Sequence, residues 1–248
     1  MSLYVDTHCH LDMFRNPLKA LDEAPNTVAV LMTELPSRYR LLEARFRKDK
    51  RVRVALGLHP LRAADAGPLE EGQLIRQLAN ALYIGEVGLD FSVHGQDSKS
   101  AQLRVFERLL AEPLLRNKVV SVHTRGAEVA AIDRLEAVGV KAILHWYTGP
   151  PGLVDNALAA GLYFSVNPAM LRTKKGQQLI TMLPHDRLLT ESDGPFARAA
   201  GHPAGPLDMA RLVSELARLR HEEPDRLRTT IHDNLAKLYA VTCGSAPR

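Results

Sequence analysis

Short apolar runs alternate with amphipathic segments along most of the chain. Eight runs rich in Val, Ile, Leu and Tyr have the length of buried strands: LYVDTH, TVAVLMT, VRVALGLH, LYIGEVGLD, VVSVHT, VKAILHW, LYFSVN and RLLTESD. The stretches between them, such as SAQLRVFERLLAEPLLRN and GAEVAAIDRLEAVG, carry apolar residues three and four positions apart, which predicts helices. Gly139, at the end of the second stretch, is a helix-stop signal directly before the next strand. Strands that alternate with single helices pair in parallel, so the pattern predicts an α/β fold.

Eight such units fit a (β/α)8 TIM barrel, and a doubly wound open sheet is the alternative. Polar residues at or just after the strand ends favour the barrel: His8, His10, His59, Glu86, Asp90, His123, His145, Asn167 and Asp193. Barrels collect catalytic groups from many strands at this face, whereas an open sheet concentrates them at one switch point. Two helical segments follow the loop PFARAAGHPAGP, and no linker or repeat divides the chain. We therefore expect one barrel domain of the metal-dependent hydrolase type over residues 1–248.

The composition is that of an ordinary globular protein. The 248 residues are 46% hydrophobic and 24% charged, and no apolar run reaches the length of a membrane span. The first residues lack the hydrophobic core of a signal peptide, so the sequence gives no indication of export. The two cysteines, Cys9 and Cys243, lie at opposite ends and do not form a disulfide framework. These features predict a cytoplasmic protein without a membrane partner.

The net charge of +4 suits a polyanionic partner without requiring one. The densest basic stretch is SRYRLLEARFRKDKRVR, which precedes the third predicted strand. We interpret it as the solvated face of a helix whose buried face comes from Leu41, Leu42 and Phe46.

The histidines and carboxylates at the strand ends predict a metal site. His8 and His10 project to the same side of the first strand, because side chains at i and i+2 do so. Any one of these residues alone is explained by a hydrogen bond or a salt bridge, but burying all of them together is costly without a cation. The number of ligands indicates two divalent metal ions. The expected ligands are His8, His10 and Asp193 for one ion and His123 and His145 for the other, with Glu86 bridging both. Imidazole and carboxylate ligands suit Zn, Mn or Fe, and Mg with fewer histidines engaged.

The motifs HCHLD, GLHP, IGEVGLDF, VHTRGA, HWYTG and LPHDRLLTESDGPF, in this order and at these spacings, resemble the TatD-type metal-dependent deoxyribonucleases of the amidohydrolase superfamily. The resemblance spans essentially the whole chain. It implies a barrel, a two-metal site, and hydrolysis of phosphodiester bonds in DNA, often from the 3′ end. The family's metal ligands fall on the six residues named above, and its additional active-site histidine falls on His59.

Chemical roles follow for individual residues. Asp193 is a candidate to orient and deprotonate the nucleophilic water, and His59 to donate a proton to a phosphate or leaving oxygen. Arg125, at the expected start of a helix, is a candidate phosphate ligand with a surface salt bridge as the alternative. Arg172, Lys174 and Lys175 are candidates to contact the nucleic-acid backbone. The alternative is that they belong to a solvated loop.

Other residues at this face are expected to support the site. Asp90 is expected to orient a ligand histidine, and Glu191 to lie one layer deeper. Trp146 and Tyr147 are candidates for base stacking or for core packing.

Two segments depart from the family pattern. GLDFSVHGQDSKSAQ replaces an aromatic and basic run, and the loop after Asp193 lacks an arginine-asparagine-proline run. Both departures lie where the substrate is bound. They therefore affect the choice of substrate, which we expect to be single strands or ends of DNA, more than the metal chemistry. Divergent members of this family also occur in multi-gene antiviral systems, which leaves room for a protein partner. The sequence predicts no oligomeric state.

Two other classes of function fit parts of the sequence. One is an amidohydrolase acting on amide, lactone or amine substrates. Binuclear members of that class commonly bridge their metals through a modified lysine at the end of the fourth or fifth strand. Here the nearest lysine, Lys118, lies at the start of the fifth strand, at the other end of the barrel. The other is a non-enzymatic nucleic-acid-binding or partner-binding component with a structural metal. Structural sites are closed by four ligands, whereas six ligands beside His59 predict an open catalytic site.

Overall fold

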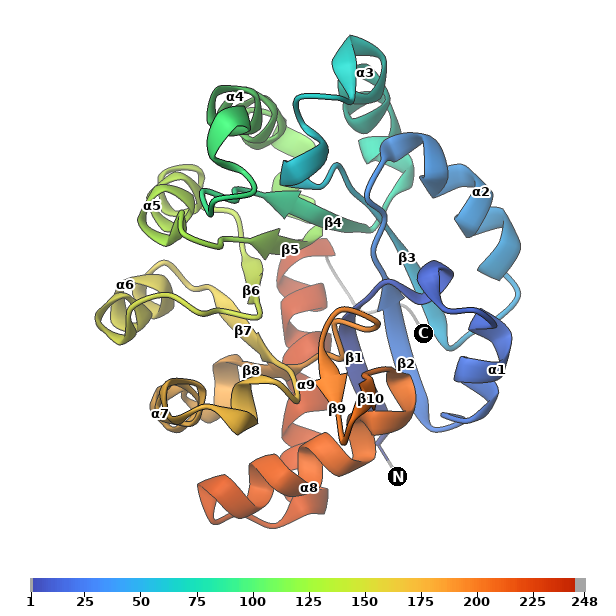
Figure 1. Cartoon of the computed structure of the whole chain (residues 1–248), viewed down its shortest axis with the longest axis vertical. Helices are drawn as coiled ribbons and strands as arrows, with labels where there is room; N and C mark the ends of the chain where they lie inside the picture. The colour runs from blue at the N-terminus through green and yellow to red at the C-terminus, as the bar shows by residue number, and fades with distance from the viewer. Residues whose placement is uncertain (1, 244–248) are drawn as a thin grey trace.

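Eight parallel strands form the centre of the molecule, and helices surround them (Figure 1). The computed structural model describes residues 2–243. The strands of the central sheet are β1 (Tyr4–Cys9), β2 (Thr27–Leu31), β3 (Val52–Leu56), β4 (Tyr83–Gly88), β5 (Val119–His123), β6 (Ala142–His145), β7 (Tyr163–Val166) and β8 (Leu188–Thr190). The helices are α1 (Pro17–Asp22), α2 (Pro36–Phe46), α3 (Gly67–Gln77), α4 (Lys99–Leu110), α5 (Glu128–Val138), α6 (Val154–Ala159), α7 (Lys174–Met182), α8 (Met209–Arg220) and α9 (Pro224–Cys243). All eight predicted strands are found within or close to their predicted runs.

Each strand pairs with the next one along the chain, which gives the order β1 to β8. The result is a nearly closed barrel, so the predicted (β/α)8 fold is confirmed. Hydrogen bonds join the two edge strands: Thr190 Oγ1 donates to the Val5 carbonyl (2.6 Å), and the Asp193 amide donates to the His8 carbonyl (2.9 Å). The segment after β8 is thereby held against the end of β1.

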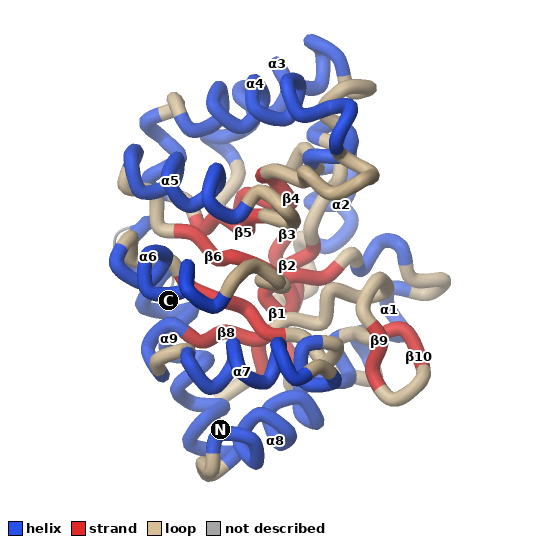
Figure 2. The backbone as a smooth tube through the Cα atoms, turned by 60° about the vertical axis from the view of Figure 1, so that its left-hand side comes forward, coloured by secondary structure: helices blue, strands red, loops and turns tan. Residues whose placement is uncertain are grey.

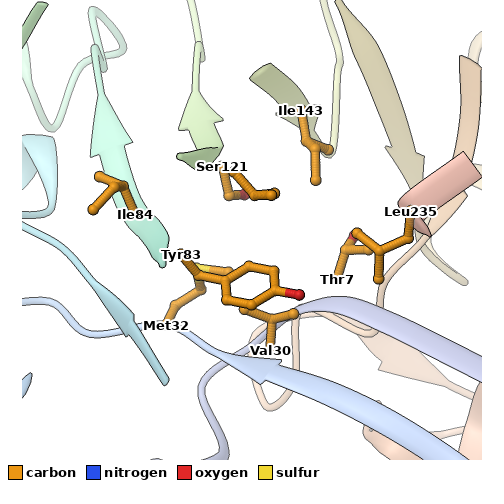
Figure 3. Close-up of a pocket in the computed structure, with 9 residues that line it drawn as sticks. Thr7, Val30, Met32, Tyr83, Ile84, Ser121, Ile143 and Leu235 are labelled. Atoms are coloured by element: carbon orange, nitrogen blue, oxygen red, sulfur yellow. The ribbon is translucent and has the colours of Figure 1, made fainter. Parts of the chain in front are cut away.

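The interior of the barrel is filled by side chains. Figure 3 shows Tyr83 of β4 among residues from several strands, with Leu235 of α9 beside Thr7 of β1. The space that remains between them is too small for a water molecule. Such filling is typical of these barrels, whose interior is a packed core and not a pore. Cys9 points away from the interior and packs with Leu11, Leu21 and other apolar residues under α1 and α2.

Local signals in the sequence explain several element ends. Gly139 ends α5 in the left-handed conformation, at φ +68°, as expected of a C-terminal glycine. The long stretch predicted as one helix after residue 100 is divided, because Pro113 cannot continue α4 and begins a short 3-10 helix, Pro113–Asn117. In α2, Leu42 and Phe46 are buried as predicted, but Leu41 is 64% exposed. One residue turns a helix by about 100°, which rotates Leu41 off the buried face.

A small hairpin of β9 (Arg198–Ala199) and β10 (His202–Pro203) follows the barrel and stands out from the strands in Figure 2. The last helix, α9, contacts β1, β5 and β8. Figure 1 places it behind the strands. Among the described residues, no helix combines the length and the apolar character needed to cross a membrane.

Candidate metal centre

Five imidazole rings meet at the carboxyl ends of the barrel strands. They belong to His8 of β1, His10 just after it, His59 after β3, His123 of β5 and His145 of β6. The rings of His8 and His145 stack with their centroids 3.9 Å apart. His8, His10 and His145 are buried, whereas the side chain of His59 is 13% exposed. The rings therefore form a cluster that is reached from one side.

The carboxylate of Glu86, in β4, lies at the centre of this cluster. Its Oε2 atom is 3.4 Å from Nε2 of His8 and 3.2 Å from Nε2 of His10. Its Oε1 atom is 2.7 Å from Nδ1 of His123 and 2.9 Å from Nε2 of His145. The two oxygens thus face two different groups of histidines, as expected for a bridging ligand.

Asp193 completes the first group. Its Oδ1 atom is 3.7 Å from Nε2 of both His8 and His10. The residue has a positive φ of 46°, which is uncommon outside glycine and is found more often at functional sites. The hydrogen bonds between the edge strands hold the Asp193 backbone in this position, so the barrel closure itself delivers the carboxylate to β1.

The donor set fits divalent metal ions. Nε2 of His8 and Nε2 of His10 are 3.3 Å apart, and Nδ1 of His123 and Nε2 of His145 are 3.2 Å apart. Neutral imidazoles present lone pairs, and buried carboxylates require a compensating charge. Three groups of donor atoms lie close enough to hold an ion: His8, His10 and Asp193; His59, Glu86 and His123; and His8, His145 and Glu191. His59 thus lies in one of the groups that could hold an ion, whereas the sequence predicted it only as an additional active-site residue.

Polar side chains behind the cluster fix the orientation of the rings. Asp90 Oδ2 is 2.9 Å from Nε2 of His123, which leaves Nδ1 of that ring toward Glu86. Nδ1 of His8 is 2.8 Å from the hydroxyl of Ser121. Glu191 is fully buried and accepts the Trp146 amide hydrogen (2.8 Å). Asp90 and Ser121 thus set the direction of the His123 and His8 rings, and Oε1 of Glu191 lies 3.8 Å from Nδ1 of His145.

Charges in the cluster shift the pKa values of its carboxyl groups. Burial raises the pKa of Asp193 to about 7, although His145 and His10 oppose the shift. Burial would also raise the pKa of Glu86, but the neighbouring imidazoles, above all His59 and His145, bring it well below its usual range. For Asp90, burial is outweighed by the hydrogen bond with His123, and the pKa falls to about 2. Glu86 and Asp90 are therefore ionised at neutral pH, and Asp193 is close to its titration point.

Metal uptake should depend on pH for this reason. Burial lowers the pKa of His10, His123 and His145, but contacts with carboxylates, chiefly Glu86 and Asp90, raise it overall. When folding raises the pKa of a histidine, the resulting stability is fully present at pH values below the pKa of the unfolded state. It is lost as the pH rises through the pKa of the folded state. The raised pKa of Asp193 also removes stability as the pH rises toward 7. His8, whose pKa is lowered by burial, acts in the opposite direction, and the lowered pKa values of Glu86 and Asp90 change the stability only at lower pH.

We therefore expect the thermal midpoint of the protein in EDTA to fall between pH 5.5 and pH 8, by about 2–10 °C. The shift caused by added Zn or Mn should grow over the same range, because metal ions displace the protons that these groups hold at low pH. Differential scanning fluorimetry with and without metal measures both trends. A metal-induced shift that is equal or smaller at pH 8 would contradict this electrostatic description.

The four candidate substrate-binding cations lie after strand ends at the same face, apart from the ligand cluster. Arg125 is exposed in the loop between β5 and α5 and makes no ion pair within residues 2–243. The sequence expected it at a helix start, but α5 begins three residues later, at Glu128. Arg172 and Lys174 are exposed, and Nζ of Lys175 donates to the Thr148 carbonyl (2.6 Å) in the loop after β6.

Two aromatic candidates have different environments. Tyr147 is 1% exposed, packs edge-on against Phe164 and donates to the Pro150 carbonyl, so its packing is that of a core residue. Trp146 is partly exposed, and its backbone has a positive φ of 37°.

Two residues of the site were not predicted from the sequence. Phe196 is 55% exposed and packs edge-on against His10, with ring centroids 4.9 Å apart. Ser121 supports His8 from β5. A signal for Ser121 was available, because it precedes His123 by two positions and so shares its side of the strand. Phe196 carried no comparable signal, since its contact depends on the turn after Asp193.

The lysine-bridged alternative gains no support from the geometry. Lys118 directly precedes β5, at the opposite end of that strand from His123. The bridging position between the two histidine groups is taken by Glu86.

Comparisons with known proteins match most of the chain. Residues 5–240 match the family model described as "TatD related DNase". The human protein named "Deoxyribonuclease TATDN3" is 31% identical over 216 residues, which are 77% of this chain and 77% of that protein. A Pectobacterium carotovorum protein named "3'-5' ssDNA/RNA exonuclease TatD" is 29% identical over 205 residues, 75% of this chain and 76% of its own length. The crystal structure of YJJV, a TatD homologue from Escherichia coli, has a TM-score of 0.85 at 23% identity and covers 98% of both chains, so the fold is shared.

Proposed function

Because this chain belongs to the TatD related DNase family, we propose that it is a deoxyribonuclease that cleaves DNA from the 3′ end with two divalent metal ions. The observation that carries the proposal is the position of Glu86, with each oxygen near a different group of histidines. The names of the human and Pectobacterium relatives support DNA as the substrate. The Pectobacterium name also supports a single-stranded substrate and 3′ to 5′ polarity.

The proposed metal ligands are those that the sequence indicated. His8, His10 and Asp193 would hold one ion, His123 and His145 the other, and Glu86 would bridge them. When bound, a pair of such ions polarises phosphoryl oxygens and lowers the pKa of water. Zn, Mn, Fe and Mg all suit parts of this donor set.

The side chain of His59 is suited to proton donation. Its Nδ1 atom accepts a hydrogen bond from the Leu61 amide (3.1 Å), so the neutral ring carries its proton on Nε2. Nε2 is 3.4 Å from Oε1 of Glu86 and belongs to the partly exposed side of the cluster. We propose that His59 donates this proton to a phosphate oxygen or to the leaving oxygen.

Asp193 is proposed as the proton acceptor. A carboxylate beside the attacking water can accept its proton. In the metal-free protein, burial raises the pKa of this carboxyl to about 7. Its Oδ1 atom lies 3.7 Å from Nε2 of His8 and of His10, the same two rings that face Oε2 of Glu86.

One assay tests the proposed function. Metal-reconstituted protein is incubated with end-labelled single-stranded and double-stranded DNA and RNA, beside a panel of amides and lactones. We expect shortening of DNA from the 3′ end and no turnover of the amides or lactones. Turnover of an amide or lactone without DNA cleavage would replace the nuclease proposal by the amidohydrolase alternative.

Arg125 is proposed to hold a phosphate of the substrate. The Arg125→Ala variant should raise the KM for DNA about tenfold and change kcat less, because a charge-assisted hydrogen bond to phosphate is lost while the ligand cluster is untouched. Steady-state kinetics on a labelled oligonucleotide measures both constants. Arg218→Ala, an exposed arginine on α8 without an ion pair within residues 2–243, is the matched control. An unchanged KM would return Arg125 to an ordinary surface role.

A further inference from the structure

A groove of about 360 Å³ lies at the end of the barrel opposite the metal centre. It is formed by α2, by the loop that leads into β3, and by the starts of β3 and β4. Arg53 at the groove is the second residue of β3, whereas His59 follows the end of that strand. Figure 1 shows α2 on the outside of β3. The groove is therefore separate from the ligand cluster.

Three cations line this groove: Arg47, Lys50 and Arg53. Arg47 and Lys50 are exposed, and their side chains make no hydrogen bond or ion pair within the described part of the chain. Arg53 donates from Nη1 to the carbonyls of Lys50 (2.9 Å) and Val52 (3.0 Å). These bonds hold its guanidinium at the groove and leave the other N–H groups for a ligand.

The carboxylates of the groove compensate little of this charge. Asp49 is bound by Arg51, with Nη2 2.7 Å and Nε 3.0 Å from its oxygens, and these hydrogen bonds lower its pKa. Glu43 is exposed and has no ion pair within residues 2–243. Three cations thus share the groove with one uncompensated carboxylate, which leaves a local excess of positive charge.

Two buried aromatic side chains lie at the floor of the groove. Phe46 and Tyr39 are 1% and 5% exposed. The Tyr39 hydroxyl donates to the Asn80 carbonyl (3.2 Å), which ties α2 to the segment before β4. A volume of this size is typical of small-molecule pockets. Basic side chains above an apolar floor suit a phosphate ester, whose charge is met by the rim and whose organic part lies below.

We propose that this groove is a second binding site for the phosphate groups of a nucleotide or of a nucleic-acid strand. Guanidinium groups bind phosphate through paired N–H donors, and lysine adds a mobile point charge. The basic stretch that the sequence presented as a solvated helix face acquires a binding role in this proposal. The site does not depend on the nuclease activity, because its ligand is held without any chemical step.

Equilibrium binding in EDTA tests the groove without turnover. The probes are deoxyadenosine 5′-monophosphate, measured by calorimetry, and a labelled 20-nucleotide single strand, measured by fluorescence anisotropy. The variant is Arg47→Gln/Lys50→Gln, and the control is Arg218→Gln/Lys237→Gln, which removes the same charge from exposed positions of α8 and α9. Both variants should keep the wild-type thermal midpoint, because all four side chains are exposed. Arg47→Gln alone is the second variant.

The groove variant should weaken binding of at least one probe about tenfold, and the control less than twofold. A loss for the mononucleotide identifies a free nucleotide as the ligand. A loss for the strand alone identifies the strand, and the slope of log K against log salt should then fall by about 1.4 for two lost phosphate contacts. Equal losses in the variant and the control, or wild-type affinity of the variant for both probes, would overturn the proposal. Because no cleavage is measured, a failure of the nuclease proposal would not affect this result.

Discussion

Replacing Asp193 by Asn should lower the rate of phosphodiester hydrolysis by about 10²–10⁴-fold and leave the protein folded. The amide keeps the shape of the carboxyl group but cannot accept the proton of an attacking water. It is also a weaker metal ligand beside His8 and His10. Loss of activity is therefore expected from both of the roles that we propose for this residue.

The same substitution should not destabilise the protein in EDTA. Burial raises the pKa of Asp193 to about 7, which means that the fold disfavours its charged form. A neutral side chain of equal size removes this penalty, so the thermal midpoint at pH 8 should be equal to that of the wild type or higher.

Asp208→Asn is the matched control for this substitution. Asp208 is 4% exposed, and its pKa is also raised by burial, but its contacts are with Gly205 and His202 and not with the ligand cluster. The activity of the Asp208→Asn variant should match that of the wild type. A folded Asp193→Asn protein with the wild-type rate would remove Asp193 from the mechanism.

Replacing Glu86 by Gln should have the larger effect on metal content. The carboxylate is within 3.4 Å of a nitrogen of each of the five histidines. The amide offers one oxygen instead of two, so it cannot bridge two ions, and its NH2 group faces imidazoles. We expect the loss of at least one metal ion per chain and a fall in activity of about 10³-fold or more, in the range found when whole catalytic units are removed.

Unlike Asp193→Asn, this variant should also be less stable in EDTA. The pKa of Glu86 is well below its usual range, so the fold favours its ionised form. The resulting stability is present at neutral pH and is lost only as the pH falls through the pKa of Glu86 in the folded protein. Removing one partner of a buried ionic cluster costs about 3–5 kcal/mol. In EDTA, Glu86→Gln should therefore lower the thermal midpoint, whereas Asp193→Asn should not.

Glu71→Gln is a suitable control for stability. Glu71 is 6% exposed and pairs with Arg104 and Arg108 on α4, remote from the strand ends. Its loss should lower the midpoint without lowering the metal content measured by plasma mass spectrometry. If Glu86→Gln retains the full metal content, the bridging role is wrong.

Most of the barrel could be predicted because its signals are local. Each strand is a short apolar run, each helix has its own periodicity, and a glycine such as Gly139 marks an end. The gathering of histidines and carboxylates could be predicted for a related reason. Parallel strands in a barrel place their carboxyl ends on one face, so His8, Glu86 and His123 come together without knowledge of any side-chain contact.

The features that were missed have different causes. Leu41 was assigned to the buried face because it is apolar, although its angle on α2 turns it outward. Phe196 reaches His10 only through the turn after Asp193, and the groove cations gather only when α2 lies on β3. The charges of Arg47 and Lys50 are visible in the sequence, but which carboxylates neutralise them is not.

The most direct measurement of the central claim is an anomalous difference map from crystals grown with Mn or Zn. We expect two peaks per chain, about 3.5–4 Å apart, on either side of the Glu86 carboxylate. One peak should be bound by His8, His10 and Asp193, and the other by His123 and His145. A single peak, or ions bound away from Glu86, would contradict a two-metal centre.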